Sequence, residues 1–252
     1  MRACWILLLL APIATRAEPL RAHYATYAAG LNVVQMDALM DFSGQRYRLD
    51  LEFETAGTFA LLNKTRLLSR ADGRFAGGAA LPLRFYSAGT MRGERRQTLI
   101  DYGSGQPALK ELSPPNEAER EEVPEELRRN TIDSLSAMAQ LIEQVNRSGR
   151  CEGSARTFDG RRLGQMRAWT LGEENLAATD RSSFAGPALH CAFEGWQVAG
   201  FRNDESRERQ QRPQQGGAWF AVASPGGPKI PVRISFHTRW FGDAVMYLAP
   251  KG

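Results

Sequence analysis

The stretch from Asp180 to His190 brings together the residue types of a serine hydrolase. Asp180, Ser182 and Ser183 precede His190 by only a few positions. A catalytic triad needs these groups to converge in space beside an oxyanion hole, and the chain has no Gly-x-Ser-x-Gly turn to present the serine. Short polar side chains before Gly186-Pro187 commonly bond to the backbone in turns. We therefore expect a turn here, and no catalytic residue elsewhere in the chain.

The first seventeen residues have the pattern of a secretory signal peptide. Arg2 supplies a positive start, residues 5–11 are an apolar run, and residues 15–17 offer a cleavage site near Ala17. The run is roughly half of the about 20 residues that a spanning helix needs. Cys4 precedes the run, so it is not placed like the acylated cysteine of a lipoprotein. We expect a soluble periplasmic protein without a transmembrane segment, with a mature chain of residues 18–252 forming a single domain.

Export would leave Cys151 and Cys191 as the cysteines of the mature chain. An even count in an oxidising compartment predicts one disulfide between them. Closing a loop of about 40 residues would stabilise the fold by roughly 4 kcal/mol. The alternative, a catalytic thiol at Cys191, has only the adjacent His190 in its favour, and neighbours on a strand point to opposite faces.

Metal, cofactor and nucleic-acid sites are not indicated. The histidines His23, His190 and His237 follow no zinc-ligand spacing, and the glutamates between Glu117 and Glu126 lack the turn glycine of a calcium loop. The formal charge of +4 falls to +2 when Arg2 and Arg16 are removed, since 30 basic residues then face 28 acidic ones. Basic and acidic residues alternate along the chain, which argues against a nucleic-acid stripe. We expect no cofactor.

Alternating hydrophobicity predicts a mainly antiparallel β protein. In residues 35–55 the apolar side chains occupy every second position on both sides of Ser43-Gly44-Gln45, which is typical of a hairpin with one dry face. Short strands with turn signals recur from residue 66 onward, and connections this short favour a meander. Pro231 begins the strand-like run from Ile230 to Trp240, which places the start of that run toward a sheet edge.

One segment follows the helical period instead. Ile132, Leu135, Met138, Ala139, Ile142 and Val145 are spaced by three and four residues. Asn130 or Thr131 is the expected N-cap and Gly149 the expected C-cap. The apolar stripe must be buried against the sheet. We interpret residues 113–129 and 203–217, which are polar, as solvated connections, and the first has room for a short helix.

Taken together, these features resemble the DUF3108 family of exported proteins of Gram-negative bacteria. The resemblance rests on residues 24–30 before the hairpin, the segment from Thr131 to Ala137, Phe158-Asp159-Gly160, and residues 230–234. It implies a curved antiparallel sheet, or half-barrel, wrapped around one helix, similar to the half-barrels of lipoprotein carriers. The family has no established activity, so the resemblance implies no catalytic residues.

The inner face of such a sheet predicts the candidate binding site. Its apolar side chains are core in a closed sandwich, and in a half-open barrel some of them would line a cavity for an apolar or lipid-like ligand. We therefore expect a non-enzymatic binding protein or a cell-envelope maintenance role, and the alternative is a scaffold or assembly factor that docks an envelope protein. The candidate lining residues are Met36, Met40, Tyr47, Leu49, Leu51, Phe53, Ile234, Phe236 and Trp240.

Overall fold

A computed structural model describes residues 18–238 and 242–250 of the chain, except for the side chain of Ala118. The segment expected to be a signal peptide, residues 1–17, and the candidate lining residue Trp240 lie outside the described residues.

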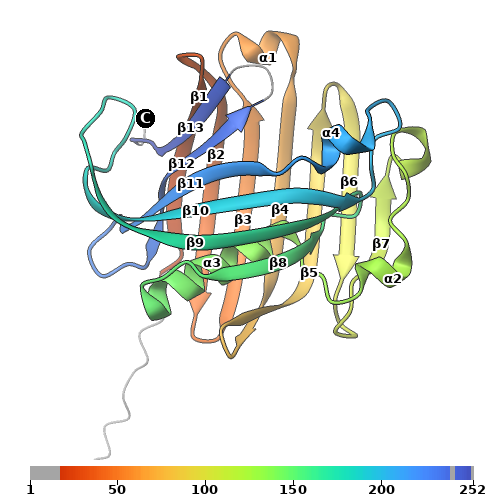
Figure 1. The fold of residues 1–252 in the computed structure, drawn as a ribbon, viewed down its shortest axis with the longest axis horizontal. Coiled ribbons are helices and arrows are strands. Elements are labelled where there is room, and N and C mark those ends of the chain that lie inside the picture. Colours follow the sequence, from red (N-terminus) through yellow and green to blue (C-terminus); the bar gives the residue numbers. More distant parts are fainter. Residues whose placement is uncertain (1–17, 239–241, 251–252) are drawn as a thin grey trace, which may run out of the picture.

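The described residues form one antiparallel sheet of 13 strands (Figure 1). Its order is β7-β6-β5-β4-β3-β2-β1-β13-β12-β11-β10-β9-β8. The strands are β1 (Leu20–Ala28), β2 (Leu31–Ser43), β3 (Arg46–Thr55), β4 (Thr65–Ala76), β5 (Ala79–Met91), β6 (Glu94–Asp101), β7 (Ala108–Ser113), β8 (Gly153–Phe158), β9 (Leu163–Leu176), β10 (Gly186–Ala199), β11 (Gln214–Val222), β12 (Lys229–Thr238) and β13 (Gly242–Leu248). The helical segments are α1 (Phe59–Leu62), the 3-10 turn η1 (Asn116–Ala118), α2 (Glu125–Arg128), α3 (Ser134–Ser148) and α4 (Arg207–Gln211).

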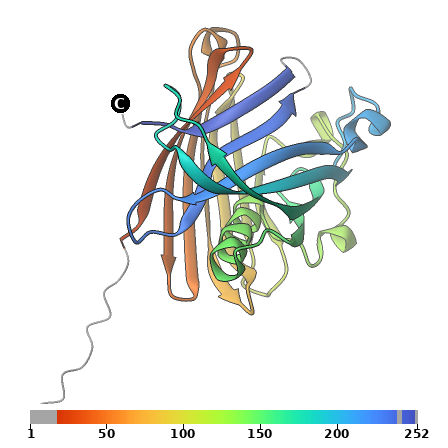
Figure 2. The same cartoon turned by 60° about the vertical axis from the view of Figure 1, so that its left-hand side comes forward.

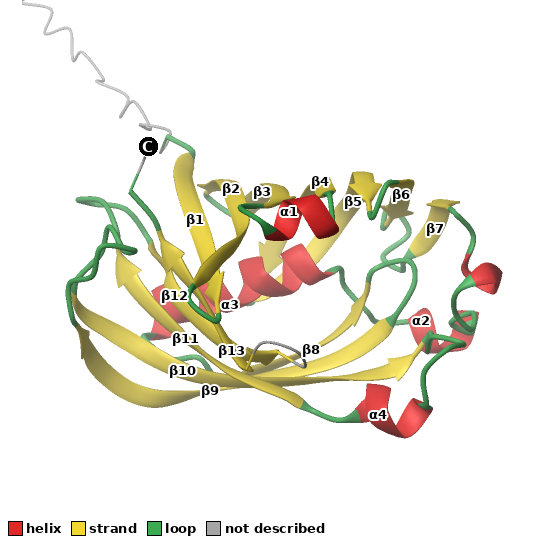
Figure 3. Ribbon diagram, turned by 90° about the horizontal axis from the view of Figure 1, so that it is seen from above, coloured by secondary structure: helices red, strands yellow, loops and turns green. Residues whose placement is uncertain are grey.

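Two meanders make up this sheet, and they meet at its centre. β1 to β7 run outward in sequence order, and β8 to β13 return until β13 pairs with β1. The strand that ends the first meander and the strand that begins the second are therefore the two edges of the sheet. The sheet curves around α3 without closing (Figures 2 and 3). This confirms the expected half-barrel.

The hairpin of β2 and β3 has the register that its sequence predicts. Met40 pairs with Leu49, and Phe42 pairs with Tyr47, so the apolar side chains share one face. Met40, Tyr47 and Leu49 are buried in the main core. The dry side is the concave face that receives α3.

The expectation for Pro231 is wrong. Its strand, β12, lies inside the sheet between β11 and β13. The proline is tolerated there because the register shifts between Trp219 and Phe220 of β11, and Phe220 then pairs with Pro231. A bulge removes the need for the backbone donor that proline lacks.

The helix α3 lies on the concave face and buries Ala139, Ile142 and Val145. Its C-cap is Gly149 in the left-handed conformation, as predicted. Its N-cap is Asp133, not Asn130 or Thr131. The carboxylate of Asp133 accepts a hydrogen bond from the Ser136 amide at 2.8 Å. Thr131 instead donates its hydroxyl hydrogen bond to the Arg128 carbonyl.

The two polar stretches are less solvated than expected, and the first contains a short helix, as its sequence allows. Residues 113–129 contain η1 and α2 and bury Asn116 and Val123. Residues 203–217 contain α4 and the start of β11, and Gln210 is buried there. Its side chain accepts a hydrogen bond from the Arg202 amide at 2.7 Å. Buried polar groups of this kind fold each stretch onto the end of the barrel.

Candidate functional site

A cavity of about 300 Å³ lies between α3 and the strands of the second meander. Apolar side chains dominate its wall. From α3 come Ala137, Met138 and Leu141, and from the sheet come Ala155, Met166, Ala168, Phe193, Ala218, Phe220 and Ile234. A cavity of this size falls at the lower end of the range for small-molecule sites.

Small residues near the edge of the second meander leave space beside α3. On β8 and β9, Ala168 pairs with Gly153, and Ala155 also lines the cavity. The first meander presents large buried side chains to the helix, among them Tyr47 and Phe75. Because α3 contacts strands of both meanders, the cavity is the space beside the helix that the small residues do not fill.

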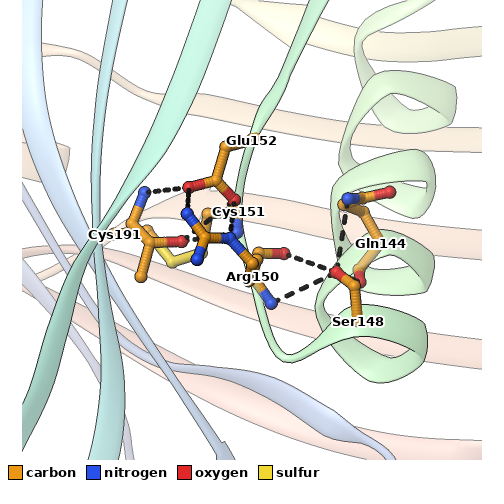
Figure 4. Close-up of a disulfide and its surroundings, with 7 residues drawn as sticks. Gln144, Ser148, Arg150, Cys151, Glu152 and Cys191 are labelled. Atoms are coloured by element: carbon orange, nitrogen blue, oxygen red, sulfur yellow. Dashed lines mark hydrogen bonds and ion pairs between the residues drawn. A yellow bond between two sulfur atoms is a disulfide. The ribbon is translucent and has the colours of Figure 1, made fainter.

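Polar groups line the outer part of the cavity. They include the half-buried side chains of Gln140 and Gln144 and the exposed side chain of Ser154. The charged residue Glu152 is already paired, since it accepts a hydrogen bond from Arg150 at 2.8 Å (Figure 4). This bond holds the pKa of Glu152 well below its usual range. The rim can therefore accept polar groups without presenting an unpaired carboxylate.

The disulfide joins Cys151 to Cys191, with the two Cα atoms 6.0 Å apart (Figure 4). This confirms the pairing that the sequence predicts. Cys151 follows the C-cap of α3, and Cys191 lies on β10 two positions before Phe193, which lines the cavity. The bond thus fixes the end of α3 relative to the β10 wall.

The candidate lining residues from the sequence are distributed between the core, the cavity and the open part of the concave face. Ile234 lines the cavity. Met40, Tyr47 and Leu49 are buried in the main core. The side chains of Met36, Leu51 and Phe53 are half-buried, and Phe236 is 38% exposed. Register pairs Met36 with Phe53 on the face shared by Met40 and Leu49, so these two also point to the concave side.

The sequence analysis did not identify the other lining residues. Met138 and Leu141 belong to the helical stripe whose burial was expected. The sequence does not mark Ala168 and Ala218 as site residues. A small residue in a strand has the same sequence pattern whether its side chain faces a cavity or packs against a neighbour. The position of α3 across the sheet determines whether such a residue lines a cavity.

The residues of the hydrolase hypothesis do not form a triad. Ser182 donates a hydrogen bond to the Phe184 carbonyl, and Ser183 donates one to the Leu248 carbonyl. His190 instead stacks on Trp219, with ring centroids 4.1 Å apart, and lies 3.2 Å from the carboxylate of Glu174. Burial lowers the pKa of His190. The turn interpretation is confirmed for Ser182, whereas Ser183 bonds to β13 and not within the turn.

A metal-binding cluster and a membrane-spanning helix are both absent from the residues that the structure describes. No three histidine, cysteine or carboxylate side chains in this part of the chain are grouped to hold a metal ion. Within the same residues, no helix has the length and apolar character that crossing a membrane requires.

Comparison with known proteins gives a family and a fold. The family profile described as "Protein of unknown function (DUF3108)" matches residues 21–249. A solved structure, the β-barrel-like protein of the domain of unknown function DUF1849 from Brucella abortus, is similar in fold with a TM-score of 0.57. The two chains are 11% identical, and the similarity covers 93% of this chain and 97% of the other. None of the curated proteins matches this chain.

Proposed function

The chain belongs to the DUF3108 family, which has no assigned function, and we propose that it binds an apolar or lipid-like ligand without catalysing a reaction. The observation that carries the proposal is the apolar cavity between α3 and β8–β12. Its walls are rigid because the disulfide and the continuous sheet hold them.

The size and chemistry of the cavity suit one hydrocarbon chain. A volume of about 300 Å³, at the lower end of the range for small-molecule sites, suits a single chain better than a bulky ligand. Each buried methylene contributes about 0.8 kcal/mol, so a filled cavity offsets several kcal/mol of association cost. The methionines Met138 and Met166 can adapt their shape to different chains. The neutral polar groups at the rim suit the headgroup end of such a ligand.

We infer the cellular location from the N-terminal sequence and the cysteines. Residues 1–17 have the signal-peptide pattern, and the Cys151–Cys191 disulfide suits the oxidising periplasm. The mature chain would begin at Glu18, two residues before β1, and form a single domain on one sheet. N-terminal sequencing of the protein from a periplasmic extract tests this point. A mature N-terminus at Met1 would contradict it.

The alternative, docking of an envelope protein on a sheet edge, has less support. The edge strand β8 is already bridged in parallel by Ile132. The Ile132 amide donates to the Arg156 carbonyl at 3.0 Å, and the Phe158 amide donates to the Ile132 carbonyl at 2.9 Å. These bonds occupy backbone groups that an added strand would need.

The binding proposal is tested by filling the cavity. Ala168 points into it from β9, whereas Ala192 on β10 pairs with Trp169 on the opposite face of the sheet. We expect Ala168→Leu to weaken binding of a dansyl-labelled fatty acid at least tenfold and Ala192→Leu to leave binding unchanged. Native mass spectrometry of the purified protein would identify a copurified ligand. Equal binding by both variants, or absence of binding by the wild type, would contradict the proposal.

A further inference from the structure

Two arginines face each other directly at the end of the barrel where α4 lies. Arg120 and Arg202 form an isolated antiparallel bridge between the segment after η1 and the segment that leads into α4 (Figure 1). The backbone hydrogen bonds of this bridge lie on either side of the arginine pair. The Glu121 amide donates to the Phe201 carbonyl at 2.9 Å. The Asn203 amide donates to the Glu119 carbonyl at 3.0 Å. The bridge is therefore the non-hydrogen-bonded kind, which brings side chains closest together.

Like charges at directly opposed positions repel each other and destabilise the pairing. A third guanidinium adds to this repulsion. Arg162 lies in the turn between β8 and β9, and its charge also disfavours the charged form of Arg120. Burial, and after it the charges of Arg162 and Arg202, lower the pKa of Arg120 to about 10, against the opposing charges of Asp159 and Glu119. The residues Arg120, Arg162 and Arg202 are called the arginine cluster below.

The carboxylates near the arginine cluster are engaged elsewhere. Arg162 pairs with Asp159 at 2.8 Å, and Arg202 pairs with Asp204 at 2.7 Å. The charge of Glu119 favours the charged form of Arg120, but the Glu119 carboxylate accepts hydrogen bonds from Arg96. Arg120 itself donates to the Gly200 carbonyl at 3.1 Å and has no carboxylate partner among the described residues.

A half-buried guanidinium that faces a like charge and forms no ion pair of its own among the described residues breaks a local rule of stability, which is expected mainly at functional sites. We propose that the arginine cluster binds an oxyanion of the phosphate class. A phosphate has the geometry for bidentate hydrogen bonds with the guanidinium fork, and its charge would remove the repulsion across the bridge. None of the three residues lines the apolar cavity, so the site is independent of the function proposed above.

Pyrophosphate in solution and phosphatidylglycerol in vesicles are the probes that distinguish the sources of such a group. We expect calorimetric binding of one of them by the wild type, weakened at least tenfold in Arg120→Gln. Arg120→Lys keeps the charge but loses the fork, so it should bind with intermediate affinity. The matched control is Arg48→Gln, because Arg48 lies on β3 and already pairs with Asp50 at 3.0 Å.

The melting temperature provides a second readout in case affinity is low. Pyrophosphate should raise the melting temperature of the wild type above its value in sodium chloride of the same ionic strength, and should not do so in Arg120→Gln. Binding of pyrophosphate identifies a soluble phosphate ligand, and binding of vesicles alone identifies a lipid headgroup. Binding of neither probe, or equal binding by Arg120→Gln, overturns the proposal.

Discussion

The phenol of Tyr47 donates a hydrogen bond to the hydroxyl of Ser136 at 2.7 Å, and this bond joins β3 to α3 inside the core. Ser136 in turn donates to the carboxylate of Asp133, the N-cap of the helix. All three side chains are buried. The chain of hydrogen bonds fixes the start of α3 against β3 of the first meander, and so sets the position of the helix beside the cavity.

Replacing Tyr47 by Phe tests this connection. The ring would keep its contact with Phe75, whose centroid is 4.9 Å away, while the bond to Ser136 would be lost. We expect the free energy of unfolding to fall by about 1–2 kcal/mol, the usual cost of losing a buried hydrogen bond. Urea denaturation measures this change. Tyr86→Phe, at a half-buried position with no side-chain hydrogen bond among those described, is the control. Equal stability of the two variants would show that the Tyr47 bond contributes nothing.

Asp133 should make the stability of the protein depend on pH. Burial raises its pKa from 3.8 to about 6, against the opposing effect of the hydrogen bonds from Ser136. Between about pH 4 and pH 6 the folded protein holds a proton that the unfolded chain has released. The free energy of unfolding therefore falls as pH rises through this window, by on the order of 2–3 kcal/mol from this group, and the contribution is constant above it.

The variant Asp133→Asn isolates this contribution, because asparagine is also a good N-cap and carries no charge. We expect its free energy of unfolding to vary less than that of the wild type between pH 4 and pH 7. Chemical denaturation at a series of pH values measures the difference, and Asp180→Asn in an exposed turn is the control. A wild-type slope that persists in Asp133→Asn would assign the pH dependence to other groups.

The sequence predicts the elements that depend on neighbouring residues. The alternation around Gly44 and the helical spacing from Ile132 to Val145 reflect one buried face each, so the hairpin and α3 were predictable. The N-cap was predicted incorrectly, since Asn130, Thr131 and Asp133 are all suitable residue types. Only the fold shows that Asp133 reaches the Ser136 amide.

The cavity and the arginine cluster could not be predicted in the same way. Both depend on which distant segments lie side by side. Ala168 and Ala218 become cavity walls only because α3 lies beside them across the concave face. Arg120 and Arg202 belong to stretches that were interpreted as solvated connections or their borders, and their repulsion appears only when the bridge between them forms.

Removing the disulfide should lower both stability and ligand affinity. The bond closes a loop with a sequence separation of 40, which corresponds to about 4 kcal/mol in the loop-entropy estimate. We expect the double variant Cys151→Ser/Cys191→Ser to lose roughly this amount in urea denaturation, and to bind the dansyl-labelled fatty acid more weakly because the end of α3 is released from β10. The wild type treated with reductant is the matched control. If the double variant is as stable as the oxidised wild type, the bond does not constrain the unfolded chain.

Arg161 lies in the turn between β8 and β9, and its side chain forms hydrogen bonds with the end of β7. It therefore links the two edge strands of the sheet. Its guanidinium donates to the Ser113 and Pro114 carbonyls, each at 2.8 Å, and to the Asn116 side chain at 3.3 Å. Each hydrogen bond from a charged group contributes about 1.5–3 kcal/mol, although partial exposure of Arg161 places the total at the low end.

We expect Arg161→Ala to unfold at lower urea concentration and to speed hydrogen exchange of the amides in β7 more than in β2. Arg147→Ala on α3, where the guanidinium lies 3.9 Å from Glu143, should change neither. Uniform acceleration of exchange in β7 and β2 would mean that Arg161 supports the whole fold and does not specifically join its edges.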